Sequence, residues 1–262
     1  MGELYFVGVG LADERDLSLR VVEELRACRT LFGEEYTATL DAGAWARLEA
    51  LVGRPVRRLD RAEVEDPKAI LGALNEPAQN PVAFLTAGDP FFATTHVALR
   101  LLAERGGHRW VYRPNASVLT AAPGFLGLMP YRFGRPVSLP FRDARFRPRS
   151  PFEGIAANRA AGLHTLVLLD LRPAEGLFLT AGEALAQFEE VDPDGAVFPS
   201  STMLAVVARL GHPDAAAWVG DRAELQRTEF GPPLHALVVL APTLHFEEEE
   251  AVARFRVGPT LR

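Results

Sequence analysis

The fold of this chain is decided by one stretch, which reads Leu85-Thr86-Ala87-Gly88-Asp89-Pro90-Phe91-Phe92-Ala93-Thr94-Thr95-His96. An apolar run from Pro81 to Leu85 predicts a buried parallel strand, and a helical pattern begins at Ala93. Glycine permits a turn that other residues resist, and proline fixes φ and lacks an N–H. The stretch therefore places Asp89 at the carboxyl edge of a sheet, where open α/β folds bind ligands. An ordinary structural turn explains this segment alone equally well.

The size and composition are those of an ordinary soluble globular protein. The chain has 262 residues, 48% of them hydrophobic and 24% charged, enough for one large domain or two modest ones. No apolar stretch approaches the roughly 18–20 residues that span a bilayer, and the N-terminus lacks a leader pattern. The single cysteine, Cys28, lies in an apolar helical pattern and predicts a core position. We expect a cytoplasmic protein with no membrane partner, because a chain without disulfides fits a reducing compartment.

The charge is unevenly distributed. A net charge of −6 argues against a general nucleic-acid binder, so we expect no direct contact with nucleic acid. Positive charge nevertheless gathers in a proline-containing segment, residues 132–149, where Asp143 is the sole acid. Its arginines are Arg132, Arg135, Arg142, Arg145, Arg147 and Arg149. This segment predicts a loop, either solvated surface or a docking surface for an acidic macromolecule.

The first half of the chain alternates strand-like and helix-like segments. Apolar runs predict strands over residues 3–11, 30–32, 56–59, 82–85 and 110–114. Helical spacing predicts helices from Leu17 onward, over 44–52 and 67–75, and up to about Arg105, where Gly106-Gly107 ends the last one. This alternation predicts a mainly parallel, three-layer α/β domain.

The second half predicts another α/β domain, with a mixed sheet. Strands are expected over 163–170, 203–210 and 234–240, a helix over 181–190, and a short strand and helix within 215–227. The small-residue segment 115–127 suits a crossing between domains, so we expect an N-terminal domain over 1–112 and a C-terminal one over 113–262. The acidic run Glu247–Glu250 is interpreted as a solvated helix face.

Several kinds of chemistry lack their sequence signals. Gly8-Val9-Gly10 follows a first strand, but the dinucleotide fingerprint needs a third glycine where Asp13 stands. There is no Walker A sequence, no Gly-x-Ser-x-Gly elbow, and no histidine spacing typical of a metal site, so we expect no metal. The residues alone predict a two-domain α/β protein with a ligand in a cleft, without identifying the ligand.

Several segments, taken together, resemble the diphthine synthase family of the tetrapyrrole (corrin/porphyrin) methylase superfamily. In chain order they are Leu4-Tyr5-Phe6-Val7-Gly8-Val9-Gly10-Leu11 with Asp13-Glu14-Arg15-Asp16, Glu35-Tyr36-Thr37, Phe84–Pro90 with Ala93-Thr94-Thr95-His96, Tyr131-Arg132-Phe133-Gly134, Asn158 with Gly162-Leu163-His164-Thr165-Leu166 through Leu169-Asp170, Ala208-Arg209-Leu210-Gly211, and Phe230-Gly231-Pro232-Pro233 with His235. They span nearly the whole chain.

The resemblance implies two α/β domains, usually as a homodimer, with S-adenosyl-L-methionine in the cleft between them. It implies methylation of the amino group of a 3-amino-3-carboxypropyl-histidine on elongation factor 2, a step toward diphthamide. The cofactor-binding positions that it carries onto this sequence are Leu11, Asp89, Phe92, Ser117, Val118, Leu169, Leu210 and His235. Phe92 is bulkier than the aliphatic residue frequent at that position. By default, each of the four apolar aliphatic positions would be core and His235 a structural histidine.

Methyl transfer to an amine needs no metal and no covalent enzyme intermediate, so the sequence offers binding loops rather than a catalytic triad. We assign Asp89 to cofactor positioning and name no catalytic base. Two alternatives remain: another methylase of the superfamily, acting on a corrin precursor or ribosomal RNA, and a cofactor-binding module that has lost catalysis. The matches at 162–170 and 230–235 argue against the first.

Overall fold

The structure is a computed structural model that describes residues 2–76, 80–195 and 197–257. It divides into two compact units: unit 1 is Met1–Ser117 with Pro173–Glu175, and unit 2 is Val118–Arg172 with Gly176–Arg262. The contact-based division falls after Ser117, whereas the sequence-based boundary lies between residues 112 and 113.

Unit 1 is built on a five-stranded sheet in the order β3-β2-β4-β1-β5, and every strand pair in it is parallel. The strands are β1 (Glu3–Gly8), β2 (Thr30–Glu34), β3 (Val56–Leu59), β4 (Val82–Thr86) and β5 (Arg109–Arg113). The helices are α1 (Leu19–Ala27), α2 (Ala44–Val52), α3 (Arg61–Glu65), α4 (Lys68–Asn75) and α5 (His96–Arg105). The predicted parallel α/β domain is therefore confirmed.

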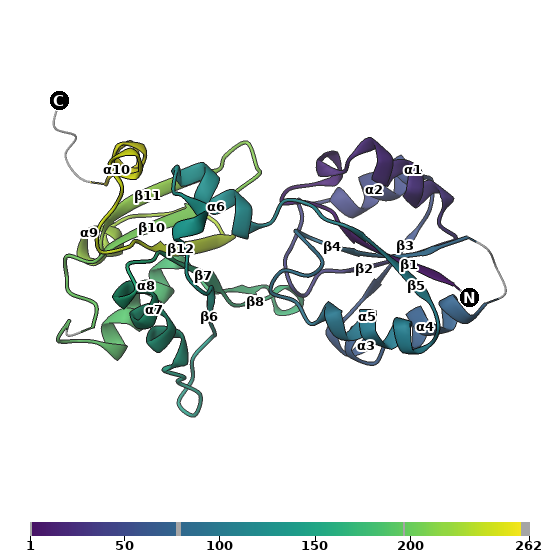
Figure 1. Ribbon diagram of the computed structural model, residues 1–262, viewed down its shortest axis with the longest axis horizontal. Helices are drawn as coiled ribbons and strands as arrows, with labels where there is room; N and C mark the ends of the chain where they lie inside the picture. Colours follow the sequence, from purple (N-terminus) through teal and green to yellow (C-terminus); the bar gives the residue numbers. More distant parts are fainter. Residues whose placement is uncertain (1, 77–79, 196, 258–262) are drawn as a thin grey trace. The chain divides into compact units, whose positions relative to one another are not determined.

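Strand alternation supplies unit 1 with two cores, one on each face of the sheet. Side chains of successive strand residues point to opposite faces. Leu4 and Phe6 accordingly pack with residues of α4 and α5, while Val7 packs with residues of α1 and α2. Figure 1 shows α1 and α2 on one side of this sheet and α3, α4 and α5 on the other. Cys28 is fully buried in the α1–α2 core, which confirms its predicted position.

Helix α5 begins later than the sequence pattern indicates. The pattern places the first helical residue at Ala93, but the helix starts at His96. Ala93 has φ 55°, and the Pro90 carbonyl accepts hydrogen bonds from the Thr94 hydroxyl and the His96 ring. The prediction was wrong because side chains of the loop bind this carbonyl, an alternative to helical pairing that a periodicity pattern does not show.

Unit 2 contains a mixed five-stranded sheet in the order β11-β10-β12-β7-β6, as predicted, in which only β6–β7 is a parallel pair. Its strands are β6 (Val137–Leu139), β7 (Thr165–Leu169), β10 (Met203–Ala208), β11 (Ala216–Asp221) and β12 (His235–Val239), and β8 (Leu171–Arg172) pairs with β9 (Leu177–Phe178). The helices are α6 (Val118–Leu126), α7 (Ser150–Ala160), α8 (Ala181–Val191), α9 (Arg222–Gln226) and α10 (Phe246–Ala253). Much of the expected crossing segment 115–127 is therefore helix α6.

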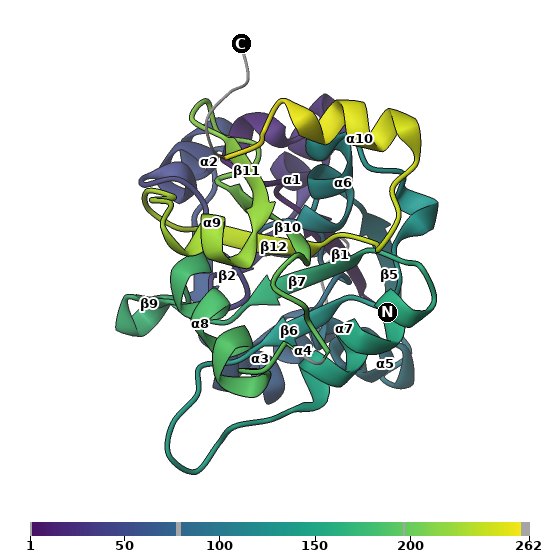
Figure 2. The same ribbon diagram turned by 90° about the vertical axis from the view of Figure 1, so that its left-hand side faces the viewer.

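Helices cover both faces of the unit 2 sheet. Phe152 and Ile155 of α7 and Phe188 of α8 join the apolar core that includes Leu237 of β12. Helices α6 and α10 lie on the other side of the strands (Figure 2), and a Cβ at Gly127, just after α6, would collide with Ala251 of α10. In the described part of the chain, every helix is too short or too polar to cross a membrane.

The acidic run in α10 differs from its prediction at one residue. Glu247, Glu249 and Glu250 are exposed, but Glu248 is fully buried. Its carboxylate accepts hydrogen bonds from the Met129 and His245 backbone N–H groups at 3.0 Å each, from His164 Nε2 at 3.1 Å, and from Arg132. The solvated-face prediction is wrong for Glu248, because helical periodicity turns one of four consecutive residues toward the sheet.

Candidate functional site

Two loops meet at the carboxyl edge of the unit 1 sheet. The first glycine loop (residues 9–13) follows β1, and the Gly-Asp-Pro loop (residues 87–92) follows β4. Gly88 N–H donates to the Gly10 carbonyl at 2.7 Å, and Gly10 N–H donates to the Gly88 carbonyl at 3.4 Å. Both glycines have left-handed φ, 98° at Gly10 and 72° at Gly88, which L side chains rarely adopt. Glycine is therefore required at both positions.

A third loop, after β5, joins them through Asn115. Its Nδ2 donates to the Gly8 carbonyl at 3.0 Å and to the Asp16 carbonyl at 3.1 Å. A Cβ at Gly8 would lie 2.5 Å from the Gly88 carbonyl oxygen and 2.8 Å from Asn115 Cβ. The three loops are thus in direct contact at this edge of the sheet.

Asp89 is held in one orientation by residues from two of these loops. Its Oδ1 accepts from Phe91 N–H at 2.9 Å, and its Oδ2 accepts from the Tyr112 hydroxyl at 2.5 Å and from Asn115 N–H at 3.4 Å. Burial and the Asp89 carboxylate raise the pKa of Tyr112, so the phenol remains a donor at neutral pH. Asp89 is half-buried, so part of its surface remains accessible.

Leu11 lies just after the bridge, on a loop that is anchored by its own polar residues. Asp16 Oδ2 accepts from the N–H groups of Leu11 and Ala12 at 2.8 Å and 3.0 Å. The other unit 1 candidates lie beside the Gly-Asp-Pro loop: Phe92 N–H donates to the Asp89 carbonyl at 3.3 Å, and Ser117 Cβ lies 3.9 Å from where a Cβ would stand at Gly88. Unit 1 thus brings together Leu11, Asp89, Phe92 and Ser117.

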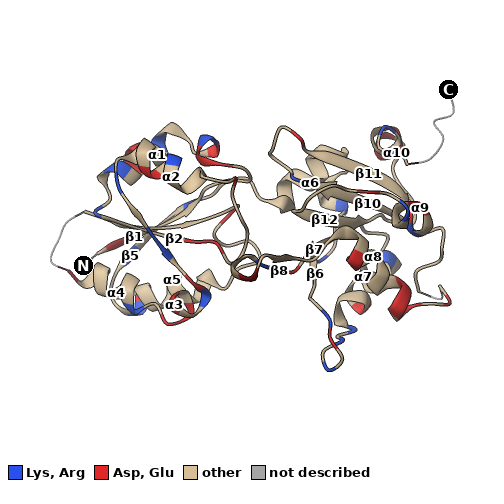
Figure 3. Cartoon of the chain, turned by 180° about the vertical axis from the view of Figure 1, so that it is seen from behind, with Lys and Arg blue, Asp and Glu red and all other residues tan. Residues whose placement is uncertain are grey.

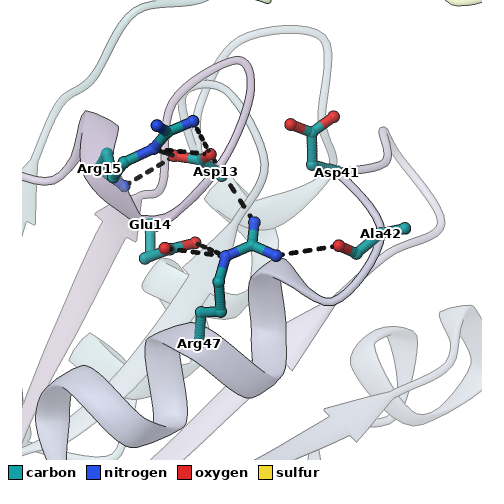
Figure 4. Close-up of a pocket in the computed structure, with 6 residues that line it drawn as sticks. All are labelled: Asp13, Glu14, Arg15, Asp41, Ala42 and Arg47. Carbon is teal, nitrogen blue, oxygen red and sulfur yellow. Dashed lines mark hydrogen bonds and ion pairs between the residues drawn. The ribbon is translucent and has the colours of Figure 1, made fainter.

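An open cavity of about 510 Å³ adjoins the first glycine loop (Figure 4). Arg47 of α2 donates to both carboxylate oxygens of Glu14 at 3.0 Å and 3.1 Å and to the Ala42 carbonyl at 3.0 Å. Arg15 pairs with the buried Asp13, and hydrogen bonding to Arg15 lowers the pKa of Asp13. Since Arg15 and Arg47 pair with Asp13 and Glu14, we interpret the cluster as a support for the loop that carries Leu11.

The other four candidates lie in unit 2. Leu169 ends β7, His235 begins β12, and Leu210 follows β10 by two residues. The register pairs Ala208 with His235 and Leu168 with Ala236, so these three candidates share one edge of the unit 2 sheet. Val118 is the first residue of α6. Their role as cofactor contacts stays a prediction.

His235 has a structural contact of its own. Its Nδ1 accepts from the Ala181 N–H at 3.2 Å, at the first turn of α8. Burial and the nearby Arg209 guanidinium lower its pKa, so the ring is neutral with its proton on Nε2. Arg209 donates to the carbonyls of Phe230 and Pro232 in the loop before it. The histidine therefore caps a helix, whatever else it contacts.

Several residues of the second-half motifs serve the fold. Arg132 and His164 bind the buried Glu248, and His164 Nδ1 accepts from Ala241 N–H at 2.9 Å. Asn158 Nδ2 donates to the Arg135 carbonyl at 2.9 Å and to Thr165 Oγ1 at 3.0 Å. These contacts join segments far apart in the sequence, so the motif residues that make them stabilise unit 2.

Sequence reasoning missed Tyr112 and Asn115 as partners of Asp89. Tyr112 alternates with Val111 along the edge strand β5, and Asn115 follows Pro114 at the strand end. A tyrosine and an asparagine flanking the carboxyl end of a parallel strand were the available signal, because such ends meet at one edge of the sheet.

Comparison with known proteins gives consistent results. Residues 3–226 match the family model of the tetrapyrrole (corrin/porphyrin) methylases. The diphthine synthase of Methanothermobacter thermautotrophicus is 36% identical over 98% of this chain and 96% of its own length. A protein of Arabidopsis thaliana, named as a probable diphthine methyl ester synthase, is 37% identical over 94% of this chain and 96% of its own. A crystal structure of diphthine synthase superposes with a TM-score of 0.86 and 34% identity, covering 97% of this chain and 96% of that one.

Proposed function

We propose that this chain takes methyl groups from S-adenosyl-L-methionine, as a methyltransferase of the family to which it belongs. The chain belongs to the tetrapyrrole methylases and, among them, to the diphthine synthases. The acceptor in the proposal is the amino group of the 3-amino-3-carboxypropyl-histidine of elongation factor 2. The observation that carries the proposal is full-length similarity to diphthine synthases, together with the interlocked loops around Asp89. The alternatives of a corrin or ribosomal RNA methylase have no comparable support.

The residues at the carboxyl edge of unit 1 suit the proposed cofactor. When bound, S-adenosylmethionine supplies an electrophilic methyl group on a cationic sulfonium. Asp89 offers a half-exposed carboxylate on a glycine-containing loop at the carboxyl edge of the sheet. An anionic group at such an edge fits a cationic ligand that carries a nucleoside.

In this proposal the chain binds and orients rather than forming a covalent intermediate. Displacement at a methyl group requires the donor and acceptor to be held in line at close distance, which by itself supplies much of a rate enhancement. Asp89 positions the cofactor, and Tyr112 and Asn115 keep its carboxylate in place. Leu11, Phe92 and Ser117 extend the same contact surface. Val118, Leu169, Leu210 and His235 are the cofactor contacts that we propose for unit 2. The amine must lose its proton before attack, and a dry site favours its neutral form.

We propose the loop between β6 and α7 as the docking site for the protein substrate. Arg142 and Arg147 form ion pairs with Glu190 of α8, which anchors the base of the loop. Arg132 forms an ion pair with the buried Glu248. Asp143 Oδ1 accepts from the N–H groups of Arg145 and Phe146 at 2.6 Å and 2.9 Å, which shapes the tip. Figure 3 shows basic residues along this projecting loop.

The exposed arginines at the loop tip form a small basic surface. Arg145 and Arg149 are exposed, and within the described residues no carboxylate pairs with either of them. Phe146, which is 53% exposed, lies between them. A loop tip that presents unpaired cations beside an exposed aromatic ring is suited to bind an acidic protein surface.

A homodimer is the assembly that we propose. The outward face of α5 carries Val97, Leu101 and Leu102, all more than one third exposed, and a second copy would cover this apolar surface.

The location that we propose is the cytoplasm, where the proposed protein substrate acts. The single thiol, Cys28, is buried and needs no oxidising compartment.

The deciding experiment incubates the protein with S-adenosylmethionine and elongation factor 2 that bears the unmethylated intermediate. Mass spectrometry of the modified histidine peptide should show successive methyl increments. Three increments identify a trimethylated amine, and a fourth that mild alkali removes identifies an additional methyl ester. Cofactor binding without any increment would refute catalysis and support the non-catalytic module.

A further inference from the structure

A buried chain of hydrogen bonds runs from the loop after β2 to the Gly-Asp-Pro loop. The Tyr36 hydroxyl lies 3.2 Å from His96 Nε2, and His96 Nδ1 lies 2.8 Å from the Pro90 carbonyl oxygen. His96 is fully buried, and its ring packs edge-on against Phe84 with centroids 4.8 Å apart. The Pro90 carbonyl belongs to the residue directly after Asp89, so this chain ends at the proposed cofactor loop.

The contacts fix which ring nitrogen of His96 carries the proton. A carbonyl oxygen only accepts, so Nδ1 must be the donor, and Nε2 then accepts from the Tyr36 hydroxyl. Burial lowers the pKa of His96 to about 4, so the ring is neutral at physiological pH. Burial likewise raises the pKa of Tyr36 to about 12, which keeps its hydroxyl proton available.

This tautomer distinguishes His96 from the other buried histidines. In His108, His164 and His235, Nδ1 accepts a backbone N–H, so the proton of each neutral ring lies on Nε2. His96 is the buried histidine whose Nδ1 faces a carbonyl instead. Its proton position is therefore a distinct and observable property.

Tyr36 is itself held by the buried carboxylate of Glu34. Glu34, at the end of β2, accepts from the N–H groups of Tyr36 and Thr37 at 2.9 Å and 3.1 Å, and from the Thr37 hydroxyl at 2.5 Å. The turn that presents the Tyr36 hydroxyl is thus fixed from inside the sheet. The Glu35-Tyr36-Thr37 segment is thereby linked through Tyr36 to His96.

We propose that Tyr36 is a positioning residue for the methyl-donor site, because its hydroxyl, together with the Pro90 carbonyl, holds His96 in the Nδ1–H tautomer and so ties down that carbonyl beside Asp89. This proposal rests on the proposed function, since it assigns the cofactor to that loop. Without the hydroxyl, Nε2 has lost its donor and only the Pro90 carbonyl favours the Nδ1–H form, so a fraction of the rings takes the Nε2–H form. In that fraction the Nδ1 lone pair faces the Pro90 carbonyl, and the loop loses this anchor.

The tautomer is tested on the protein without cofactor. Long-range ¹H–¹⁵N correlation spectra of labelled protein should show one neutral histidine with the proton on Nδ1, and its signals should vanish in His96→Asn. In Tyr36→Phe, the same histidine should shift toward the Nε2–H form. A Tyr5→Phe variant is the matched control, since Tyr5 is a half-buried tyrosine of the same sheet. An unshifted His96 in Tyr36→Phe would overturn the proposal.

The consequence for the site is measured by calorimetry with S-adenosylmethionine. Tyr36→Phe should raise the Kd about threefold to tenfold, the value of one neutral hydrogen bond, while Tyr5→Phe leaves it unchanged. The carboxamide of His96→Asn can donate to the Pro90 carbonyl but has no tautomer to fix. Adding Tyr36→Phe to His96→Asn should therefore cost no further affinity.

These outcomes separate the two proposals. A wild-type protein that binds no S-adenosylmethionine contradicts the proposed function, whatever the spectra show. Normal binding by wild type with an unchanged Kd in Tyr36→Phe contradicts the positioning role alone. A purely structural Tyr36 would lower the melting temperature without moving the tautomer or the Kd of the folded fraction.

Discussion

Gly10 and Gly88 form a two-residue antiparallel bridge between loops that follow parallel strands. The bridge carries hydrogen bonds of 2.7 Å and 3.4 Å, and both residues have positive φ. It makes the first glycine loop and the Gly-Asp-Pro loop one structural unit. The position of Asp89 therefore depends on its own turn and, through the bridge, on the first glycine loop that follows β1.

Replacing Gly10 should lower the free energy of unfolding by more than an unfavourable φ alone would cost. A Cβ at Gly10 would collide with Asp16, whereas a Cβ at Gly53, which also has positive φ, would meet nothing within 4 Å. We expect Gly53→Ala to lose about 1 kcal/mol of unfolding free energy and Gly10→Ala about 2–4 kcal/mol, with weaker cofactor binding only in the latter. Denaturant titration and calorimetry measure both. Equal losses would show that the Asp16 contact is unimportant.

The burial of neutral His96 should make the protein less stable in acid. Its pKa is about 4 in the folded protein against 6.5 ordinarily, so the unfolded state binds more protons below pH 6.5. Stability from this group is therefore present above pH 6.5 and falls as the pH drops toward 4. From pH 7 to 5 the loss is about 2 kcal/mol. Denaturant titrations should show a correspondingly smaller loss in His96→Asn. The same pH dependence in both proteins would contradict this origin.

The buried carboxylate of Glu248 should be essential to unit 2 stability. Removing its charge leaves Arg132, His164 and two backbone N–H groups with a poorer acceptor, so Glu248→Gln should cost about 3 kcal/mol. Glu249→Gln, at the neighbouring exposed position of the same helical turn, should cost less than about 0.5 kcal/mol. Thermal and denaturant unfolding compare the two. Similar costs would mean that the buried network contributes nothing beyond the helix charge.

Charge reversal at the tip of the β6–α7 loop should weaken recognition of the protein substrate. Arg145→Glu with Arg149→Glu should raise the KM for elongation factor 2 about tenfold without changing cofactor affinity. Arg20→Glu with Arg105→Glu makes the same change in net charge on exposed residues of unit 1 and should leave KM unaltered. The wild-type KM should also rise with salt. If the two double variants raised the KM equally, the effect would come from the overall charge of the protein and not from this loop.

Local pattern was sufficient for elements that combine clear periodicity with terminal glycines. The bounds of the helix over 44–52, which lies between Gly43 and Gly53, were predicted to the residue from the spacing of Trp45, Leu48 and Leu51. Trp45 and Leu48 are buried as that spacing requires, but Leu51 is exposed and Val52 packs in the core instead. Helix α7 was not predicted, since its core contacts include Pro151 and Asn158, which no apolar period would select. Glu248 was misplaced for a related reason: besides the His245 N–H, its donors come from two other segments, residues 129–132 and His164, and only the fold brings them together.

The site was predictable at its backbone and not at its supporting side chains. Glycines and a proline after a strand identify a turn at a sheet edge, and this located Gly88 and Asp89. The hydroxyl of Tyr112 comes from 23 residues away, and Tyr36 lies 60 residues from His96. Such pairs depend on the order of the strands, which periodicity does not specify. The candidate residues of unit 2 were predicted from the family resemblance alone. The structure adds a capping role for one of them, His235.

Titration calorimetry of S-adenosylmethionine into Asp89→Ala is the direct test of methyl-donor binding at the Gly-Asp-Pro loop. Asp66→Ala is the control, because Asp66 is an exposed acid in the same unit. We expect wild type and Asp66→Ala to bind alike and Asp89→Ala to bind at least about tenfold more weakly, the value of a lost charged hydrogen-bond acceptor. An Asp89→Ala protein that is folded and binds S-adenosylmethionine as tightly as wild type would contradict it.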